Sequence, residues 1–273
     1  MSLPEFRADH IEIVPGTIQP YVVIGGGVTP MVVVPGAADG LRTCMDVAVY
    51  LAWFYRERVK DCRMLILSRR EPLPAGFGVE QHAEDMLWAV ERLSFGPAVW
   101  ECLSAAGPIG QWAATKRPDL VRGLILSSSY DYVTGKLKKS LERWLEIARQ
   151  GGTSDPFWSV IEPKYRPPAD VIAQLDPVLL QGAATPRSPE RFDNLLTPLL
   201  DLDQRDLVAQ ISCPTLVVGG EDDRSVPAEA QREMAQRISG AQLKLYPGFG
   251  HFNDMENPEY QPLVTQFAQN SMS

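Results

Sequence analysis

The chain has 273 residues, 45% of them hydrophobic and 22% charged, which is ordinary for a globular protein with one large core. A net charge of −8 and a pI near 5.0 disfavour nucleic acid and anionic membranes as partners, because both would repel it. No secretory signal pattern opens the chain and no apolar run is long enough to span a bilayer, so we expect a cytoplasmic protein.

The predicted elements alternate between strand and helix over the first half of the chain. Residues 10–14 and 21–24 predict an antiparallel pair of strands, and a third strand follows at 31–34. A helix at about 41–58, a strand at 63–68, a helix from 79 to 93, a strand at 97–103, a helix at 108–116 and a strand at 124–128 come next. This alternation predicts an α/β fold with a mostly parallel, doubly wound sheet flanked by helices.

A strand, a turn of small residues and a helix meet at Ser104. The apolar run 97–103 ends at Ser104-Ala105-Ala106-Gly107, and the helix that follows stops before Pro118. A nucleophilic serine needs this context, because only small neighbours tolerate the sharp turn that lifts its Oγ clear of the sheet. Ser104 is therefore the candidate nucleophile, with a helix-capping serine as the alternative.

A candidate base and a candidate acid follow two later strands. His251, one of three histidines, stands in Pro247-Gly248-Phe249-Gly250-His251 directly after the strand pattern 242–246, where it could act as general base. The apolar run 214–218 leads into Gly220-Glu221-Asp222-Asp223, so that Asp223 or its neighbour lies at the carboxyl edge of a sheet, where sites form. A solvated turn is the alternative for these acidic residues.

Several stretches of the sequence resemble the α/β-hydrolase family. They are residues 118–126, residues 213–218, Gly220 to Asp223 followed by Pro227, and Gly250-His251 with Glu256-Asn257-Pro258-Glu259. The resemblance covers about residues 30–128 and 205–270. The resemblance implies a Ser-His-Asp triad of Ser104, His251 and Asp223. It favours Asp223 over Asp222 because the family spaces its acid four residues before a proline such as Pro227. Asp131 is a third candidate, since some hydrolases hold the acid after the strand that ends near 128.

The sequence departs from the family at the nucleophile. The family's Gly-x-Ser-x-Gly is Cys102-Leu103-Ser104-Ala105-Ala106 here, and the bulkier cysteine requires a different packing of the strand. Family members end the next helix at a proline fourteen residues past the serine, and Pro118 fits Ser104 rather than Cys102.

The resemblance also implies an oxyanion hole made by two backbone N–H groups, those of Ala105 and Ala37. Ala37 lies in the loop 35–40, where Pro35-Gly36 replaces the family's common His-Gly. An ordinary glycine-rich turn is the alternative for this loop.

Residues 131–205 break the alternation and resemble the family's helical cap, inserted into a core of residues 1–130 and 206–273. An amphipathic helix at 136–150 opens the segment, and eight prolines divide the rest into short pieces. A cap supplies the substrate pocket and excludes water. The aromatic residues of this segment could either line an apolar substrate pocket or pack inside the cap; they are Trp144, Phe157, Trp158, Tyr165 and Phe192.

The sequence therefore predicts a serine hydrolase that cleaves a small carboxylic ester, a lactone or a related acyl bond through an acyl-enzyme. Its alternatives are a catalytically silent scaffold used for binding, and the same triad used for carbon–carbon bond hydrolysis or perhydrolysis. No cofactor or metal is expected: the four cysteines lack metal-ligand spacing, and the glycine run 25–27 lacks the features of a phosphate-binding or dinucleotide-binding loop.

Three polar residues stand outside this scheme. His10 and His82 are expected to be surface or packing residues, His82 on an exposed helix face. Glu101 falls in a central strand, where a carboxylate must be paired or have a raised pKa. It belongs either to a network behind the nucleophile or to a partly solvated strand edge.

Overall fold

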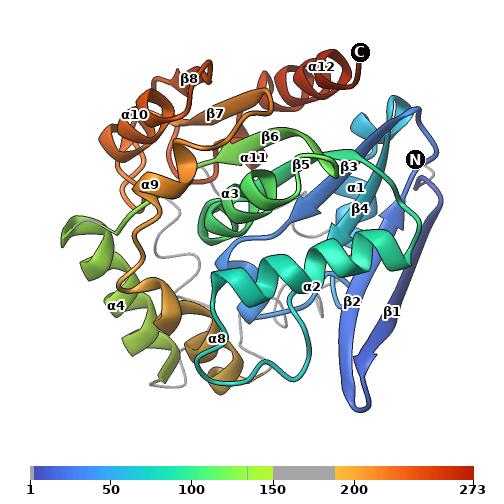
Figure 1. The fold of residues 1–273 in the computed structure, drawn as a ribbon, viewed down its shortest axis with the longest axis horizontal. Helices are drawn as coiled ribbons and strands as arrows, with labels where there is room; N and C mark the ends of the chain where they lie inside the picture. The colour runs from blue at the N-terminus through green and yellow to red at the C-terminus, as the bar shows by residue number, and fades with distance from the viewer. Residues whose placement is uncertain (1–2, 134, 150–187) are drawn as a thin grey trace, which may run out of the picture.

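The protein is described here by a computed structural model that covers residues 3–133, 135–149 and 188–273 (Figure 1). A sheet of eight strands runs through its centre in the order β1-β2-β4-β3-β5-β6-β7-β8. The strands are β1 (Phe6–Val14), β2 (Thr17–Ile24), β3 (Thr29–Val34), β4 (Cys62–Leu67), β5 (Ala98–Leu103), β6 (Val121–Ser127), β7 (Thr215–Gly220) and β8 (Gln242–Tyr246). β2 pairs antiparallel with β1 and β4, and the remaining neighbours are parallel. The predicted fold class is confirmed.

Helices cover both faces of the sheet, which explains why its central strands are apolar on both sides. α2 (Val79–Arg92), α3 (Gly107–Lys116) and α10 (Ala228–Arg237) pack on one face, and α1 (Ala48–Phe54) and α12 (Tyr260–Met272) pack on the other. Successive side chains of a strand point to opposite faces. In β3, Val32 and Val34 accordingly pack in the core under α2, α3 and α10, and Met31 and Val33 pack in the core under α1 and α12.

The helix predicted at about 41–58 is shorter in the structure. A 3-10 turn at Ala37–Gly40 precedes this range, turns occupy 41–47, α1 follows, and a second 3-10 turn at Arg58–Lys60 ends the stretch. Asp46 Oδ2 accepts hydrogen bonds from the backbone N–H and the hydroxyl of Thr43 at 2.9 and 3.0 Å, and Cys44 N–H donates to Ser68 Oγ at 2.6 Å. The backbone bonds Asp46 N–H to Thr43 O and Ala48 N–H to Met45 O close separate turns over this stretch, and the helix begins only at Ala48.

The expectation that His82 lies on an exposed helix face is wrong. The imidazole of His82 is 4% exposed and packs edge-on against Phe77, with ring centroids 4.9 Å apart. Phe77 belongs to the loop before α2, and this loop folds back over the face of α2 that carries His82. The packing role expected for this histidine is thus the one that the structure shows.

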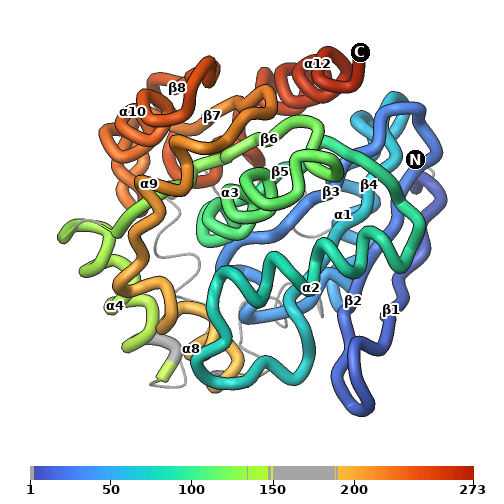
Figure 2. Tube along the Cα trace, in the orientation of Figure 1, coloured from blue at the N-terminus to red at the C-terminus, as the bar shows by residue number. Residues whose placement is uncertain are grey.

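Between β6 and β7 the chain leaves the sheet and forms α4 (Gly135–Arg149), α8 (Pro189–Leu196) and α9 (Arg205–Val208), as the tube in Figure 2 shows. α4 confirms the predicted helix at 136–150. The chain departs and returns at one place, where Tyr132 and Asp203 form a β-bridge and Val133 N–H donates to Leu202 O at 3.0 Å. Phe157, Trp158 and Tyr165 lie outside the described residues. Within the described ranges, no helix combines the length and apolarity needed to cross a bilayer.

Glu101 is a buried member of the central strand β5 and is 1% exposed. Its carboxylate forms an ion pair with the buried guanidinium of Arg58 and accepts a hydrogen bond from the Tyr260 hydroxyl at 2.8 Å. Arg58 lies in the turn after α1 and Tyr260 begins α12, so this network joins the strand to both helices on one face. The partly solvated edge considered for Glu101 is therefore wrong, and the carboxylate is paired.

Replacing Arg58 with Met should strongly destabilise the protein, because the Glu101 carboxylate would stay buried without its cation. Breaking a buried pair in this way costs about 3–5 kcal/mol, to be measured as the free energy of unfolding in urea. Arg117→Met is the control, since Arg117 pairs with the exposed acids Glu91 and Asp119. Equal unfolding midpoints for the two variants would contradict a stabilising role for the buried pair.

Candidate active site

Ser104 occupies a strained turn at the carboxyl end of β5. Its φ is 49°, a left-handed conformation that is uncommon for residues other than glycine. The turn fits only because two glycines lie against it: a Cβ on Gly36 would crowd Leu103 O and the Ser104 side chain, and a Cβ on Gly107 would overlap the Ser129 side chain. Strained backbone of this kind concentrates at functional sites.

The cysteine that replaces a family glycine two residues before Ser104 is accommodated by a glycine on α3. A Cβ on Gly110 would overlap the Cys102 side chain, so the missing side chain at 110 makes the room that Cys102 needs. Cys102 is fully buried, and burial raises the pKa of its thiol well above the usual range. A thiol in this state is a poor nucleophile compared with one that ionises near neutral pH.

The structure brings the side chains of Ser104, His251 and Asp223 together in one chain of hydrogen bonds. His251 Nε2 lies 2.9 Å from Ser104 Oγ, and His251 Nδ1 lies 2.8 Å from Asp223 Oδ2. The other carboxylate oxygen, Asp223 Oδ1, accepts the backbone N–H groups of Ser225 and Val226, each at 2.8 Å. This arrangement fixes the carboxylate so that only one of its oxygens faces the imidazole.

The two other candidate acids bind elsewhere. Asp222 Oδ2 accepts the backbone N–H of Gly248 at 2.8 Å and so connects the acidic turn to the loop that carries His251. Asp131 is buried, and its carboxylate accepts hydrogen bonds from Arg237 Nη1 at 3.0 and 3.3 Å. Burial raises the pKa of Asp131, and the neighbouring Arg237 opposes that shift. Of the three acids, Asp223 is the one hydrogen-bonded to His251.

The two backbone groups expected to form an oxyanion hole lie at the starts of helical turns. Ala37 is the first residue of the 3-10 turn Ala37–Gly40, and Ala105 is the second residue of the 3-10 turn Ser104–Ala106 that leads into α3. N–H groups in the first turn of a helix have no acceptor within it, so both are available to a ligand. Ala37, Ala105 and Ser104 line the same cavity.

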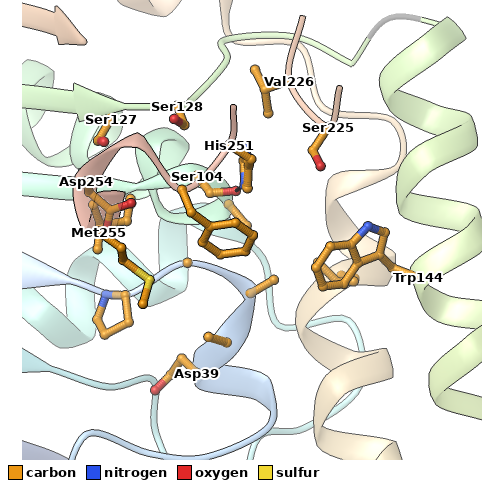
Figure 3. Close-up of a pocket in the computed structure, with 18 of the residues that line it drawn as sticks. Asp39, Ser104, Ser127, Ser128, Trp144, Ser225, Val226, His251, Asp254 and Met255 are labelled. Carbon is orange, nitrogen blue, oxygen red and sulfur yellow. Dashed lines mark hydrogen bonds between the residues drawn. The ribbon is translucent and has the colours of Figure 1, made fainter. Parts of the chain in front are cut away.

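The cavity in front of Ser104 has a volume of about 290 Å³ and is predominantly apolar. One wall comes from α1, with Tyr50, Leu51 and Phe54, and another comes from α4, with Leu141 and Trp144. Figure 3 shows Ser104 and His251 near its middle, with Trp144 on one side and Asp254 and Met255 on the other. In the described part of the chain, no cluster of His, Cys, Asp or Glu side chains is arranged to hold a metal ion.

Among the ionisable side chains that line this cavity, His251 and Asp254 have shifted pKa values that bear on the candidate base. Burial alone would lower the pKa of His251. The negative charges of Asp223 and Asp254 both raise this pKa, Asp223 more strongly, and together they outweigh burial, so the pKa of His251 is raised. Burial, with the charge of Glu101 as a second cause, raises the pKa of Asp254 to about 6. Asp254 was missed in the sequence because no motif contains it, although its place three residues after His251 was a usable signal.

A family model described as alpha/beta hydrolase fold matches residues 67–258. By sequence the chain is similar to a Klebsiella pneumoniae protein named "Putative carbamate hydrolase RutD", with 27% identity over 184 residues, or 66% of this chain and 68% of the relative. By structure it is similar to an esterase from Exiguobacterium antarcticum (TM-score 0.81, 18% identity, covering 96% of this chain and 100% of that one). It is also similar to the enol-lactonase from Burkholderia xenovorans LB400 (TM-score 0.74, 20% identity, 96% and 100%). At these identities the structural likeness shows the fold.

Replacing Gly110 with Ala should displace the Cys102 side chain and distort the turn at Ser104, because the new Cβ would overlap that side chain. Overpacking of this kind costs roughly 1–3 kcal/mol, visible as a lower melting temperature. The double variant Gly110→Ala with Cys102→Gly should regain much of the loss. A single variant as stable as the parent would mean that α3 shifts freely and that residue 110 does not limit residue 102.

Replacing Asp254 with Asn should lower the pKa of His251, because it removes a negative charge that stabilises the imidazolium. The difference should be clearest above about pH 6, where Asp254 is ionised in the parent. NMR titration of the His251 ring measures this pKa directly. Asp222→Asn is the control, since Asp222 binds Gly248 N–H instead. An unchanged or higher pKa in Asp254→Asn would show that this carboxylate does not act on the base.

Proposed function

This chain belongs to the alpha/beta hydrolase family, and we propose that it is a serine hydrolase that cleaves a small carboxylic ester, a lactone or a related acyl bond. The observation that carries the proposal is the hydrogen-bonded series Ser104 Oγ, His251 and Asp223 at the wall of an apolar cavity. A nucleophile, a base within hydrogen-bond reach and a group that orients the base are the parts that covalent acyl transfer requires.

In the proposed reaction, Ser104 Oγ attacks the substrate carbonyl carbon while His251 Nε2 takes its proton. Asp223 holds the imidazole in the tautomer with the proton on Nδ1 and stabilises the imidazolium that forms. The N–H groups of Ala37 and Ala105 receive the negative oxygen of the tetrahedral intermediate. His251 then gives its proton to the leaving group, and a water molecule repeats the sequence to release the acid from Ser104.

We further propose that residues 131–205 form a cap over a core of residues 1–130 and 206–273. The β-bridge between Tyr132 and Asp203 marks the base of such an insertion, and α4 contributes Leu141 and Trp144 to the cavity wall. Trp144 also stacks on Phe192 of α8, with centroids 6.3 Å apart, so it takes part in packing as well. An apolar cavity of this volume fits a small substrate with a hydrophobic acyl or alcohol part.

A silent binding scaffold is the weaker alternative. The left-handed backbone of Ser104 costs of the order of 1–3 kcal/mol, and a protein that only binds would not need to hold a serine in this conformation against a histidine. Carbon–carbon bond hydrolysis and perhydrolysis would use the same three side chains. The printed names of the similar proteins, "Putative carbamate hydrolase RutD", an esterase and an enol-lactonase, support carbonyl substrates and define which compounds to test first.

Labelling with a fluorophosphonate tests the nucleophile, and a panel of short and long acyl esters, lactones and carbamates tests the substrate class. The parent should carry one adduct on Ser104, and Ser104→Ala should carry none while remaining folded. Asp223→Asn should lower kcat by roughly 10⁴, whereas Asp222→Asn, whose side chain binds Gly248 N–H, should change it little. An adduct on Cys102, or no adduct and no turnover, would overturn the proposal.

A further inference from the structure

The two amide groups proposed for the oxyanion hole share their peptides with carbonyls that each accept two kinds of donor. Gly107 N–H donates to Ser104 O and Asp39 N–H donates to Gly36 O within the 3-10 turns, and a buried side chain adds a further donor to each carbonyl. Each amide belongs to a planar trans peptide, in which C=O and N–H point in opposite directions. The Ala37 N–H shares its peptide with Gly36 C=O, and the Ala105 N–H shares its peptide with Ser104 C=O. A donor that fixes either carbonyl on one side therefore fixes the direction of the N–H on the other.

Ser129 holds the first of these peptides. Its hydroxyl donates to Ser104 O at 2.8 Å, and the residue is fully buried just after β6. Its side chain occupies the space left by Gly107, in which a Cβ would overlap Ser129 Oγ. The hydroxyl is thus confined behind the turn, on the side opposite to the Ala105 N–H.

Arg69 holds the second peptide and joins the two loops. This guanidinium is 1% exposed; its Nη1 donates to Pro35 O at 2.9 Å and to Gly36 O at 3.2 Å, and its Nη2 approaches Ala105 O at 3.4 Å. The planar fork of an arginine can span several acceptors with fixed geometry, which a lysine cannot do. One side chain therefore sets the spacing between the loop that carries Ala37 and the turn that carries Ala105.

Arg69 is itself held by a buried acid and a second arginine. Asp39 Oδ2 accepts the Arg69 backbone N–H at 2.9 Å and lies 3.4 Å from its guanidinium and 3.2 Å from that of Arg191, on α8. Arg191 also donates to the backbone oxygens of Asp39, Arg69 and Arg70 at 3.2, 3.2 and 2.7 Å. The two arginines and Asp39 together carry one net positive charge. This charge lies next to the loop 35–40, in the protein interior, where charge interactions are poorly screened.

We propose that Arg69 and Ser129 are positioning residues for the oxyanion hole, orienting the Ala37 and Ala105 amides through the carbonyl ends of their peptides. The inference rests on the proposed acyl-transfer function and adds to it. Neither side chain lines the cavity, so both act through the backbone rather than by touching substrate. Preorganised amides stabilise the charge that develops in the transition state and do little for the neutral ground-state carbonyl. Loss of orientation should therefore lower kcat more than it changes KM.

Ser129→Ala is the main test, because it removes the donor and almost no volume. We expect kcat on a short ester to fall about tenfold, a part of the roughly 10²–10³-fold loss seen when a whole oxyanion donor is removed. KM should stay within about twofold. Binding of a trifluoromethyl ketone, which forms a tetrahedral oxyanion on the serine, should weaken by the same factor as kcat. Arg69→Lys keeps the charge but not the fork, and should show the same split with a larger loss.

Thr215→Val is the matched control. The Thr215 hydroxyl is also buried and also donates to a backbone carbonyl, that of Cys213 at 3.0 Å, but it lies at the start of β7, at the opposite end of the strand from the acidic turn. It should lower the melting temperature by an amount similar to Ser129→Ala and leave kcat and inhibitor binding unchanged. If Ser129→Ala and Thr215→Val changed kcat and inhibitor binding by the same factor, Ser129 would have only a structural role and the inference would be overturned.

Crystal structures of Ser129→Ala and Arg69→Lys give a readout that does not depend on activity. We expect the Ser104–Ala105 peptide to rotate in the first and the Gly36–Ala37 peptide in the second. Unmoved peptides together with an unchanged kcat would overturn the inference while leaving the proposed function intact. A parent that neither reacts with fluorophosphonate nor turns over any acyl substrate would overturn the proposed function, and the peptide orientations would still decide whether the two side chains hold these amides.

Discussion

Parallel strands bring their carboxyl ends to one edge of a sheet, and in this protein the ends of β3 and β5 approach so closely that no side chain fits between them. Gly36 lies against Leu103 O and the Ser104 side chain, and Ser104 turns the chain with a φ of 49°. The His251 and Asp223 side chains are positioned relative to this contact between Gly36 and the turn at Ser104. The loop after β7 supplies the carboxylate and the loop after β8 supplies the imidazole that reaches Ser104 Oγ.

Buried charge supports the site on both sides of the sheet, and in each case the charge is paired rather than isolated. Arg69, Asp39 and Arg191 form one group beneath the loop after β3. Arg58 and Glu101 form the other, on the face covered by α12, together with the Tyr260 hydroxyl. Removing Arg58 would leave the buried Glu101 carboxylate without its cation, and removing Asp39 would leave two buried guanidinium groups without their shared acid. The loops of the site are therefore held by interactions that local backbone movement would have to break.

The fold, and the three side chains that meet in the candidate site, could be predicted from the sequence because their signals are local. Alternating strand and helix patterns indicate the sheet, and Ser104, Asp223 and His251 each follow a strand in a short motif. The supporting residues leave no such signal: Arg69 meets Gly36 and Ala105 only after β3, β4 and β5 have paired. The helix expected from position 41 begins only at Ala48, and the turn before it is tied to the loop after β4 by the long-range hydrogen bond from Cys44 N–H to Ser68 Oγ.

The narrow base of the segment between β6 and β7 has a consequence for how this protein can change. Val133 bonds Leu202, Gln204 N–H donates to Asp131 O at 2.8 Å, and Tyr132 pairs with Asp203, so the two ends of the segment stand side by side. The entropy of closing a loop at a fixed base grows only with the logarithm of its length. Insertions, deletions or exchange of the whole segment between relatives can therefore remodel one wall of the cavity while the sheet keeps its register. Recombination at two points, near Tyr132 and Asp203, that are distant in the sequence but adjacent in the structure is enough to exchange this wall.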